Sequence, residues 1–359
     1  MKERIQGLDF LRGFAALGVV LFHLRVIFEN FTPKTAFYDF LQNIPLPSLF
    51  LTISSFSLLY IYKDKFFNKE NIKTFFLKRF FRLLPIYWFF LILAFISNHI
   101  FNIVLSKKLL TSSIFMFFSL IPEYERGYVS GSWFLGVDII YLLIFPLLIL
   151  FLNTKKKAWA ALSITALFAV IFKNNSVLIQ NFVYYVSGFV VYNHLEDILK
   201  LRTTKFCNHF FNFSLICCIG LFVINYYFMN NYFPQEITGT IIWMTLLASS
   251  LIHLPRLYNN KITNFLAKTS YSVYFMHQFL IILMWRLNAF NLLVDNYGVE
   301  KTMIIVPLFV ISVSYGLSIF LRKYIEDPIY TAGKKWIENK KIKVIKREEE
   351  EVLITNSTV

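Results

Sequence analysis

LDFLRGFAALGVVLFHL, residues 8–24, is an apolar run that carries Arg12 and His23 inside it. A helix that spans a bilayer needs about 20 mostly apolar residues, and this run extends to residue 27. It has no small-residue cleavage site, so it predicts a retained spanning helix rather than a signal peptide. Nine further apolar runs follow it. The ten predicted spans are 8–27, 45–62, 83–105, 133–152, 158–172, 177–193, 210–228, 236–254, 271–285 and 303–321.

The composition agrees with a membrane protein. Hydrophobic residues make up 57% of the 359-residue chain and charged residues 16%, whereas soluble domains average about 45–50% and about 25%. We therefore predict an all-α fold, a polytopic membrane helix bundle of about ten transmembrane helices. The sequence has no metal-ligand cluster, no Gly-rich phosphate loop and no serine-nucleophile motif, so we expect neither a metal nor a permanently bound cofactor.

The basic residues predict the orientation in the membrane. Ten spans place both termini on the same side, together with the segments 1–12, 63–82, 153–157, 194–209, 255–270 and 322–359. All but eight of the 36 Lys and Arg residues fall in these segments. The exceptions are Arg25, Lys34, Lys107, Lys108, Arg126, Lys173, Arg286 and Lys301. The positive-inside rule then predicts that both termini are cytosolic.

The same distribution accounts for the net charge of +15 without a nucleic-acid partner. We predict a ten-span membrane domain over residues 1–328 and a charged cytosolic tail over 329–359, in a multi-pass protein of the plasma membrane.

Ionisable groups inside spans are costly, and each is a functional hypothesis. Arg12 and His23 are eleven residues apart, which on a helix brings them to within about 20° of one face and about 16 Å apart along the axis. One face therefore carries a cation at the cytosolic edge and an imidazole beyond the midplane. The alternative is that Arg12 extends to the lipid headgroups and His23 packs against a carbonyl of a neighbouring helix.

Asp138 is a third candidate, five residues inside the span 133–152. We expect it at a depth similar to that of His23, where a carboxylate would orient the ring and raise its basicity. The alternative is a structural ion pair or a hydrogen bond to backbone.

A basic segment precedes the third span. In FFLKRFFRLLPIYW, residues 75–88, Arg79 and Arg82 share a face if the segment is helical. Guanidinium groups suit phosphates, so a donor such as coenzyme A is a candidate ligand. The alternative is an anchor to anionic lipid. The hydroxyl residues near Ser54 favour close helix packing over a site.

Five motifs in order resemble the acyltransferase-3 family of bacterial membrane enzymes. They are LDFLRGFAALGVVLFHL with Arg12 and His23; KRFFRLLPIYW with Arg79, Arg82, Pro85 and Tyr87; SWFLGVDIIYLLIFPLL with Trp133, Asp138 and Pro146; KTSYSVYFMHQF with Ser270, Tyr271, Tyr274 and His277; and KYIEDP with Glu326 and Pro328. The chain departs from the family where Asp138 replaces a Glu. It also departs where Ser54-Ser55-Phe56 replaces Ser-Gly-Phe.

The resemblance implies an acyl-CoA donor, such as acetyl-CoA, bound from the cytosol. It also implies a carbohydrate acceptor at the outer face, polyprenyl-linked or part of a polysaccharide such as lipopolysaccharide or exopolysaccharide. The implied roles are His23 as general base or transient acyl carrier; Arg12, Arg79 and Arg82 on the donor; Asp138 on the histidine or the sugar; Trp133 and Ser54 on the substrate; and Tyr274 and His277 along the donor tunnel.

Two other classes compete with this hypothesis. A transporter or flippase of sugars or lipids would also carry intramembrane charges, but it should show paired broken spans and inverted halves, which this sequence lacks. A polyprenyl-phosphate glycosyltransferase generally needs acidic metal-binding loops, and none occurs here.

Overall fold

Helices make up the whole of the regular structure in the parts of the chain that the computed structural model describes, residues 5–28, 44–65, 69–172, 176–203, 207–228 and 234–340. The α-helices are α1 (Gln6–Phe28), α3 (Leu46–Tyr62), α4 (Lys69–Ile100), α5 (Lys107–Ile114), α6 (Trp133–Phe151), α7 (Lys155–Ile171), α8 (Val177–Asn193), α9 (Leu195–Lys200), α10 (Cys207–Val223), α11 (Gln235–Ile252), α12 (Lys261–Arg286), α13 (Ala289–Tyr297) and α14 (Val299–Leu321). The all-α prediction is confirmed.

Each predicted span falls on a helix, but fewer than ten helices are long and apolar enough to cross a bilayer unaided. Among the described residues six qualify, and the pair α12–α13, bent by 70°, would make a seventh. The six are Gln6–Leu24, Leu46–Lys65, Glu70–Ile100, Trp133–Phe151, Cys207–Tyr227 and Val299–Lys340. Helices α7 and α8 have only 17 residues each. The count of ten spans stays a prediction.

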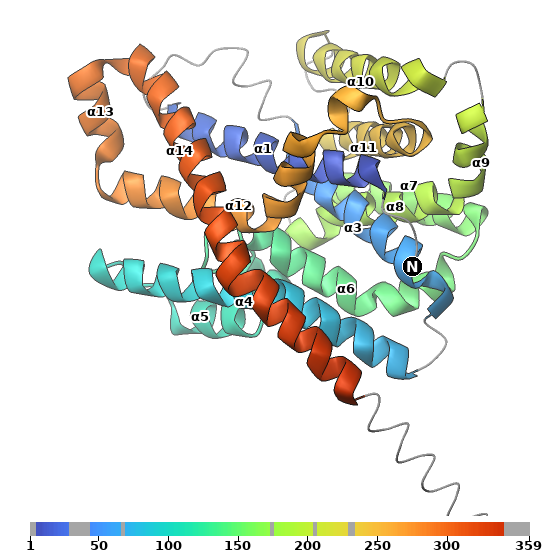
Figure 1. Ribbon diagram of the computed structural model, residues 1–359, viewed down its shortest axis with the longest axis horizontal. Coiled ribbons are helices and arrows are strands. Elements are labelled where there is room, and N and C mark those ends of the chain that lie inside the picture. Colours follow the sequence, from blue (N-terminus) through green and yellow to red (C-terminus); the bar gives the residue numbers. More distant parts are fainter. Residues whose placement is uncertain are drawn as a thin grey trace, which may run out of the picture.

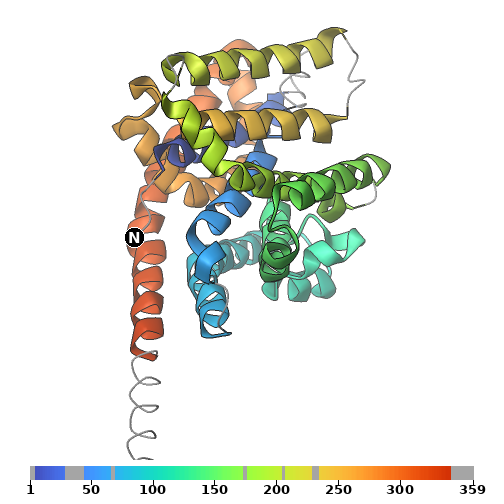
Figure 2. The same ribbon diagram turned by 90° about the vertical axis from the view of Figure 1, so that its right-hand side faces the viewer.

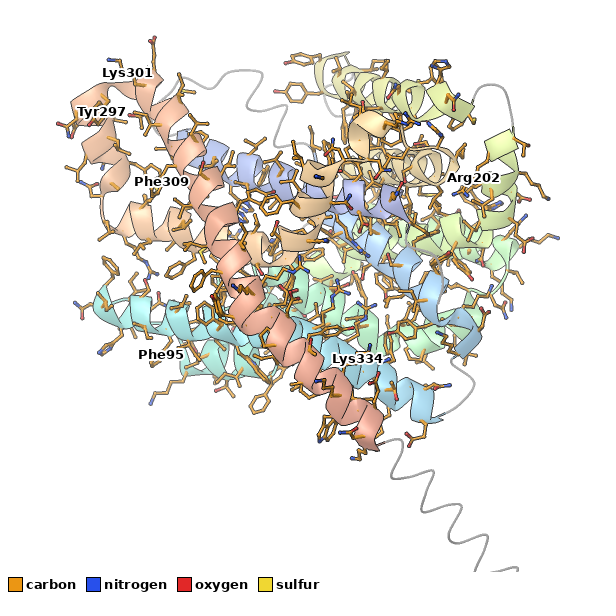
Figure 3. The ribbon with its side chains drawn as sticks, viewed as in Figure 1. Phe95, Arg202, Tyr297, Lys301, Phe309 and Lys334 are labelled. Atoms are coloured by element: carbon orange, nitrogen blue, oxygen red, sulfur yellow. The ribbon has the colours of Figure 1, made fainter. Side chains whose placement is uncertain are left out.

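The outer surface has the character of a lipid-facing surface. Ile216 on α10 is 68% exposed and Leu308 on α14 is 63% exposed. The exposed side chains of Phe95 on α4 and Phe309 on α14 also lie on the outside of the bundle (Figure 3). Water would penalise so much exposed apolar surface, whereas lipid tails do not. The protein is therefore a multi-pass membrane protein.

Helices α1 and α3 lie at the centre, and α10 lies at the edge. In its most apolar stretch, 61% of α3 is buried, against 17% of α10. Helix α1 packs along α12 and also contacts α3 and α11. Helix α14 crosses in front of α12, and the continuation of the same helix beyond Leu321 crosses in front of α4 (Figure 1). Helix α10 covers α11 at the top of the molecule in both ribbon views (Figure 2).

Small residues bring the central helices together. Gly13 on α1 faces α12 so closely that a Cβ there would lie 2.9 Å from the Cβ of Leu266. On α3, the Thr52 hydroxyl donates a hydrogen bond to the Tyr184 carbonyl of α8 at 3.0 Å. Gly188 on α8 lies against the backbone of α3. Helices α3 and α8 therefore approach closely at Ser55, the position where the chain lacks the family's glycine, and the glycine that permits the approach is Gly188 on the partner helix.

The helix that begins as α14 continues without interruption to Lys340. It passes through a π-helical turn, η7 (Arg322–Glu326), and its last turns pack on α4, where Ile337 is buried and Gly333 contacts Phe81. The domain boundary predicted at residue 328 therefore falls inside a helix. The remainder of the predicted tail, 341–359, lies outside the described residues.

Candidate functional site

Arg12 and His23 both point into the bundle from α1. Arg12 Nη2 donates a hydrogen bond to Ser57 Oγ of α3 at 2.9 Å, and Arg12 Nη1 lies 3.9 Å from Asp9 Oδ1. His23 contacts α12 through its ring. The common face predicted from their eleven-residue spacing therefore looks toward protein at both ends.

The partner of His23 is His277 of α12. The two rings meet with His23 Nδ1 3.2 Å from His277 Nε2, and their centroids are 5.2 Å apart with a 45° angle between the planes. Each ring also bonds the carbonyl four residues earlier in its own helix, His23 Nδ1 to Val19 O at 2.9 Å and His277 Nδ1 to Val273 O at 2.8 Å. A hydrogen bond between tilted rings, rather than stacking, joins the two histidines.

His23 lies on the wall of a cavity of about 1020 Å³. The C-terminal parts of α1, α4 and α12 form one part of the cavity wall. The N-terminal turns of α3, α6, α8 and α11 form another. Its polar and aromatic lining includes Ser48, Trp133, Gln180, Tyr184, Glu236 and Gln278. Amide, carboxylate and hydroxyl groups beside aromatic rings suit a polyhydroxylated ligand.

A buried carboxylate stands out on this wall. Glu236, in the first turn of α11, is 2% exposed, and its Oε1 accepts a hydrogen bond from Gln180 Nε2 at 2.5 Å. Its Oε2 has no hydrogen-bond partner within the described ranges. Buried polar atoms are seldom left unpaired, so Glu236 offers an acceptor to a ligand in the cavity.

Asp138 lies apart from His23. Ser54 Oγ donates a hydrogen bond to Asp138 Oδ1 at 3.1 Å, and the charge of Arg79 acts on the same carboxylate. Asp138 is 8% exposed, and neither it nor Ser54 lines the cavity. The arrangement is the structural alternative considered above, a buried carboxylate held between a hydroxyl and a guanidinium. The position expected for Asp138 beside His23 is taken by His277.

A second, smaller pocket of about 190 Å³ lies at the other end of α1. Its charged lining consists of the cations Arg12, Arg82, Lys268 and Arg322 and the acids Asp9, Glu326 and Asp327. Two of these residues belong to the π-helical turn η7, a kind of turn frequent at functional sites. This basic pocket can hold an anionic group such as a phosphate.

The shared face had suggested that Arg79 and Arg82 act at one site, but only Arg82 lines the basic pocket. Both residues are on α4, but positions three apart point about 60° away from each other around a helix. Arg82 therefore faces the pocket while Arg79 faces Asp138.

The resemblance implies that Tyr274 and His277 lie along the donor tunnel, and the structure places both away from the basic pocket. Helix α12 begins at Lys261, where Asn260 and Thr263 form a capping box, rather than at residue 271. His277 is therefore about 24 Å along the helix. Tyr274 donates a hydrogen bond to the Gly131 carbonyl at 2.7 Å, in a loop beside the cavity where Gly131 has φ +77°. Both side chains belong to the cavity end and not to the basic pocket.

Trp133 lines the cavity, and its substrate role stays a prediction. The sequence did not single out Glu236 and Gln180 of the cavity or Lys268 and Arg322 of the basic pocket. The rule that an ionisable residue within a span is a functional candidate would have found Glu236, because it is the first residue of the predicted span 236–254. Across the described ranges, no group of three or more His, Cys, Asp or Glu residues could hold a metal ion.

Comparison with known proteins bears on almost the whole of this structure. A family model described as an acyltransferase domain matches residues 5–323, a range that contains Arg12, His23 and His277. No curated protein and no solved structure matches the chain.

Proposed function

The chain belongs to the acyltransferase family that matches residues 5–323, and on that premise we propose that it transfers an acyl group, in the first instance acetyl, from a coenzyme A thioester to a carbohydrate hydroxyl. Membership makes it an acyltransferase acting on groups other than aminoacyl groups. The donor, the acceptor and the route between them are proposals.

One observation carries the proposal: a single helix joins the two pockets. Arg12 lines the basic pocket and His23 lines the large cavity, about 16 Å apart along α1. Coenzyme A carries its acyl group on a long flexible arm, away from its phosphates. With those phosphates at Arg12 and Arg82, the arm would run beside α1 and bring the thioester to His23.

The cavity supports a carbohydrate as the acceptor. Glu236 and Gln180 would pair with sugar hydroxyls, and Trp133 and Tyr184 would present ring surface to the apolar faces of the sugar. A ligand hydroxyl that donates to Glu236 Oε2 would satisfy the buried oxygen that lacks a partner. Glu236 does not line the basic pocket, so a variant of it tests the acceptor class without touching the donor site.

The chemical step follows from a base at the cavity wall. His23 Nε2 removes the proton of the acceptor hydroxyl as its oxygen attacks the thioester carbonyl carbon and forms the new C–O bond. The tetrahedral intermediate then collapses and the C–S bond breaks. The proton passes from His23 to the departing sulfur, so the products are the ester and coenzyme A with a free thiol.

For the topology we propose that the chain crosses a bacterial plasma membrane ten times and that both termini lie on the cytosolic side. The short helices α8 and α11 support this count because neighbouring helices cover them, and a helix that faces protein can be shorter and more polar than one that faces lipid. The basic pocket lies at the side that we assign to the cytosol, and its Lys and Arg residues agree with the positive-inside rule.

Membranes that contain the protein, incubated with [¹⁴C]acetyl-CoA, provide the test. We expect label to enter the surface glycan as an ester that mild alkali releases, with one free coenzyme A formed per ester. A transporter or flippase would neither consume acetyl-CoA nor label the glycan, and that result would refute the proposal.

A further inference from the structure

His277 is completely buried behind His23. It is 0% exposed and does not line the cavity, whereas His23 does. A residue so placed cannot touch a substrate in the cavity, but it contacts the side chain that can. We infer that His277 is a positioning residue, which holds His23 in the tautomer whose Nε2 is the free base and stabilises the imidazolium that forms there. The inference rests on the proposed function.

The protonation of His277 follows from its partners. Its Nδ1 lies 2.8 Å from the carbonyl oxygen of Val273. A carbonyl oxygen only accepts hydrogen bonds, so this nitrogen carries the hydrogen. A neutral imidazole has one N–H, and His277 Nε2 is therefore a lone-pair acceptor.

The protonation of His23 follows in turn. Its Nδ1 faces two acceptors, the Val19 carbonyl oxygen at 2.9 Å and His277 Nε2 at 3.2 Å. Because both neighbours are acceptors, His23 Nδ1 carries the hydrogen and shares it between them. The lone pair of neutral His23 is then on Nε2, the nitrogen on the far side of the ring from these contacts. A general base needs this tautomer, with its lone pair free for the acceptor hydroxyl.

His277 also acts when His23 becomes charged. As Nε2 takes the proton, the positive charge spreads over the ring and the Nδ1–H becomes a stronger donor. Val19 O is also the normal acceptor for the backbone N–H four residues later, so it is shared within α1. The His277 lone pair has no such competing donor among the contacts observed. It therefore provides a dedicated acceptor at the moment of charge formation.

The backbone fixes this arrangement. Both rings are tied to a carbonyl of their own helix, and the two helices are held close where Gly13 meets Leu266 and Ala267. Partners that orient metal-binding histidines typically contribute about 10–100-fold, and we expect an effect of the same size for a partner that orients a catalytic histidine. A purely structural role for His277 would instead depend on the volume of the side chain.

Two matched variants separate these roles. In His277→Gln the side-chain amide oxygen can replace Nε2 as the acceptor from His23, whereas His277→Met has a similar length and volume but no comparable acceptor. His277→Asn is a second variant without the acceptor, because its shorter side chain keeps a donor for Val273 and does not reach His23. All three are assayed as full-length protein in membranes with acetyl-CoA, and thermal unfolding reports whether each is folded.

We expect His277→Met and His277→Asn to lower kcat by about 10–100-fold, with the KM for acetyl-CoA unchanged. His277→Gln should recover most of the rate. Wild-type kcat in either variant without the acceptor, or equal losses in folded Gln and Met variants, would overturn the inference.

The same assay distinguishes failure of the inference from failure of the proposed function. If wild-type membranes transfer no acetyl group, the proposed function itself fails. If wild-type protein is active, His23→Ala is inactive and His277→Met is unimpaired, only the role of His277 is wrong.

Discussion

Gly188 lies where α8 meets α3, and an added methyl group has no room there. A Cβ at this position would lie 2.5 Å from the Thr52 carbonyl oxygen and 2.8 Å from the Phe56 backbone nitrogen, and it would also overlap Ser55 Oγ. A side chain can rotate away, but the two backbone atoms cannot. Gly188→Ala should therefore force the two helices apart.

The expected magnitude combines two opposed effects. Overpacking typically costs about 1–3 kcal/mol, and replacing Gly by Ala within a helix returns about 0.5–1 kcal/mol. We expect Gly188→Ala to lower the free energy of unfolding by a net amount of about 1–2 kcal/mol. Gly220→Ala on α10 is the matched control, because nothing lies within 4 Å of its added Cβ. It should be neutral or stabilising.

Thermal unfolding in detergent measures the difference. The buried thiol of Cys218 can report unfolding with a thiol-reactive dye once Cys207 and Cys217 are replaced by Ser. Gly188→Ala should unfold at a lower temperature than the parent, and adding Ser55→Gly should restore only part of the loss because the backbone contacts remain. A Gly188→Ala protein at least as stable as the parent would refute the close packing of α3 and α8.

Three further predictions concern charged groups. Arg12→Ala and Arg82→Ala should each raise the KM for acetyl-CoA by about tenfold in steady-state assays, since a hydrogen bond to a charged group contributes about 1.5 kcal/mol or more; an unchanged KM in both would contradict a donor site in the basic pocket. Glu236→Gln should lower glycan acylation by about tenfold at an unchanged KM for acetyl-CoA, as measured by released ester, and full acylation would contradict its acceptor role. Asp138→Asn can keep the Ser54 hydrogen bond but loses the charge that faces half-buried Arg79. The free energy of unfolding should therefore fall by about 1–2 kcal/mol, which is below the range for a fully buried pair. An unaltered unfolding temperature would count against that network.

The sequence contained enough information to place helices, because an apolar run near the length of a bilayer has few other folds open to it. It also predicted that Arg12 and His23 share a face, since that depends only on the helical period. The number of crossings is harder to predict. Helices α8 and α11 carry buried polar residues such as Ser187 and Thr240, and their length and polarity depend on neighbouring helices that sequence spacing does not reveal.

The partners within the site could not be predicted because depth in a membrane says nothing about direction. Asp138 and His23 were expected at similar depth, but Asp138 faces Ser54 and Arg79 while His23 faces His277. Helix α12 also begins at Lys261, before the predicted span 271–285, because its first turns are polar and were excluded from the apolar run. Pairing between helices is a property of the packed bundle.

Replacement of His23 tests the central claim most directly. His23→Ala and His23→Gln protein, shown by thermal unfolding to be folded, should transfer acetyl groups from acetyl-CoA about 10²–10⁴-fold more slowly than wild type, because a positioned general base contributes that much. Their affinity for acetyl-CoA should be retained, since the basic pocket is about 16 Å away along α1. Transfer at the wild-type rate in either variant would contradict the account.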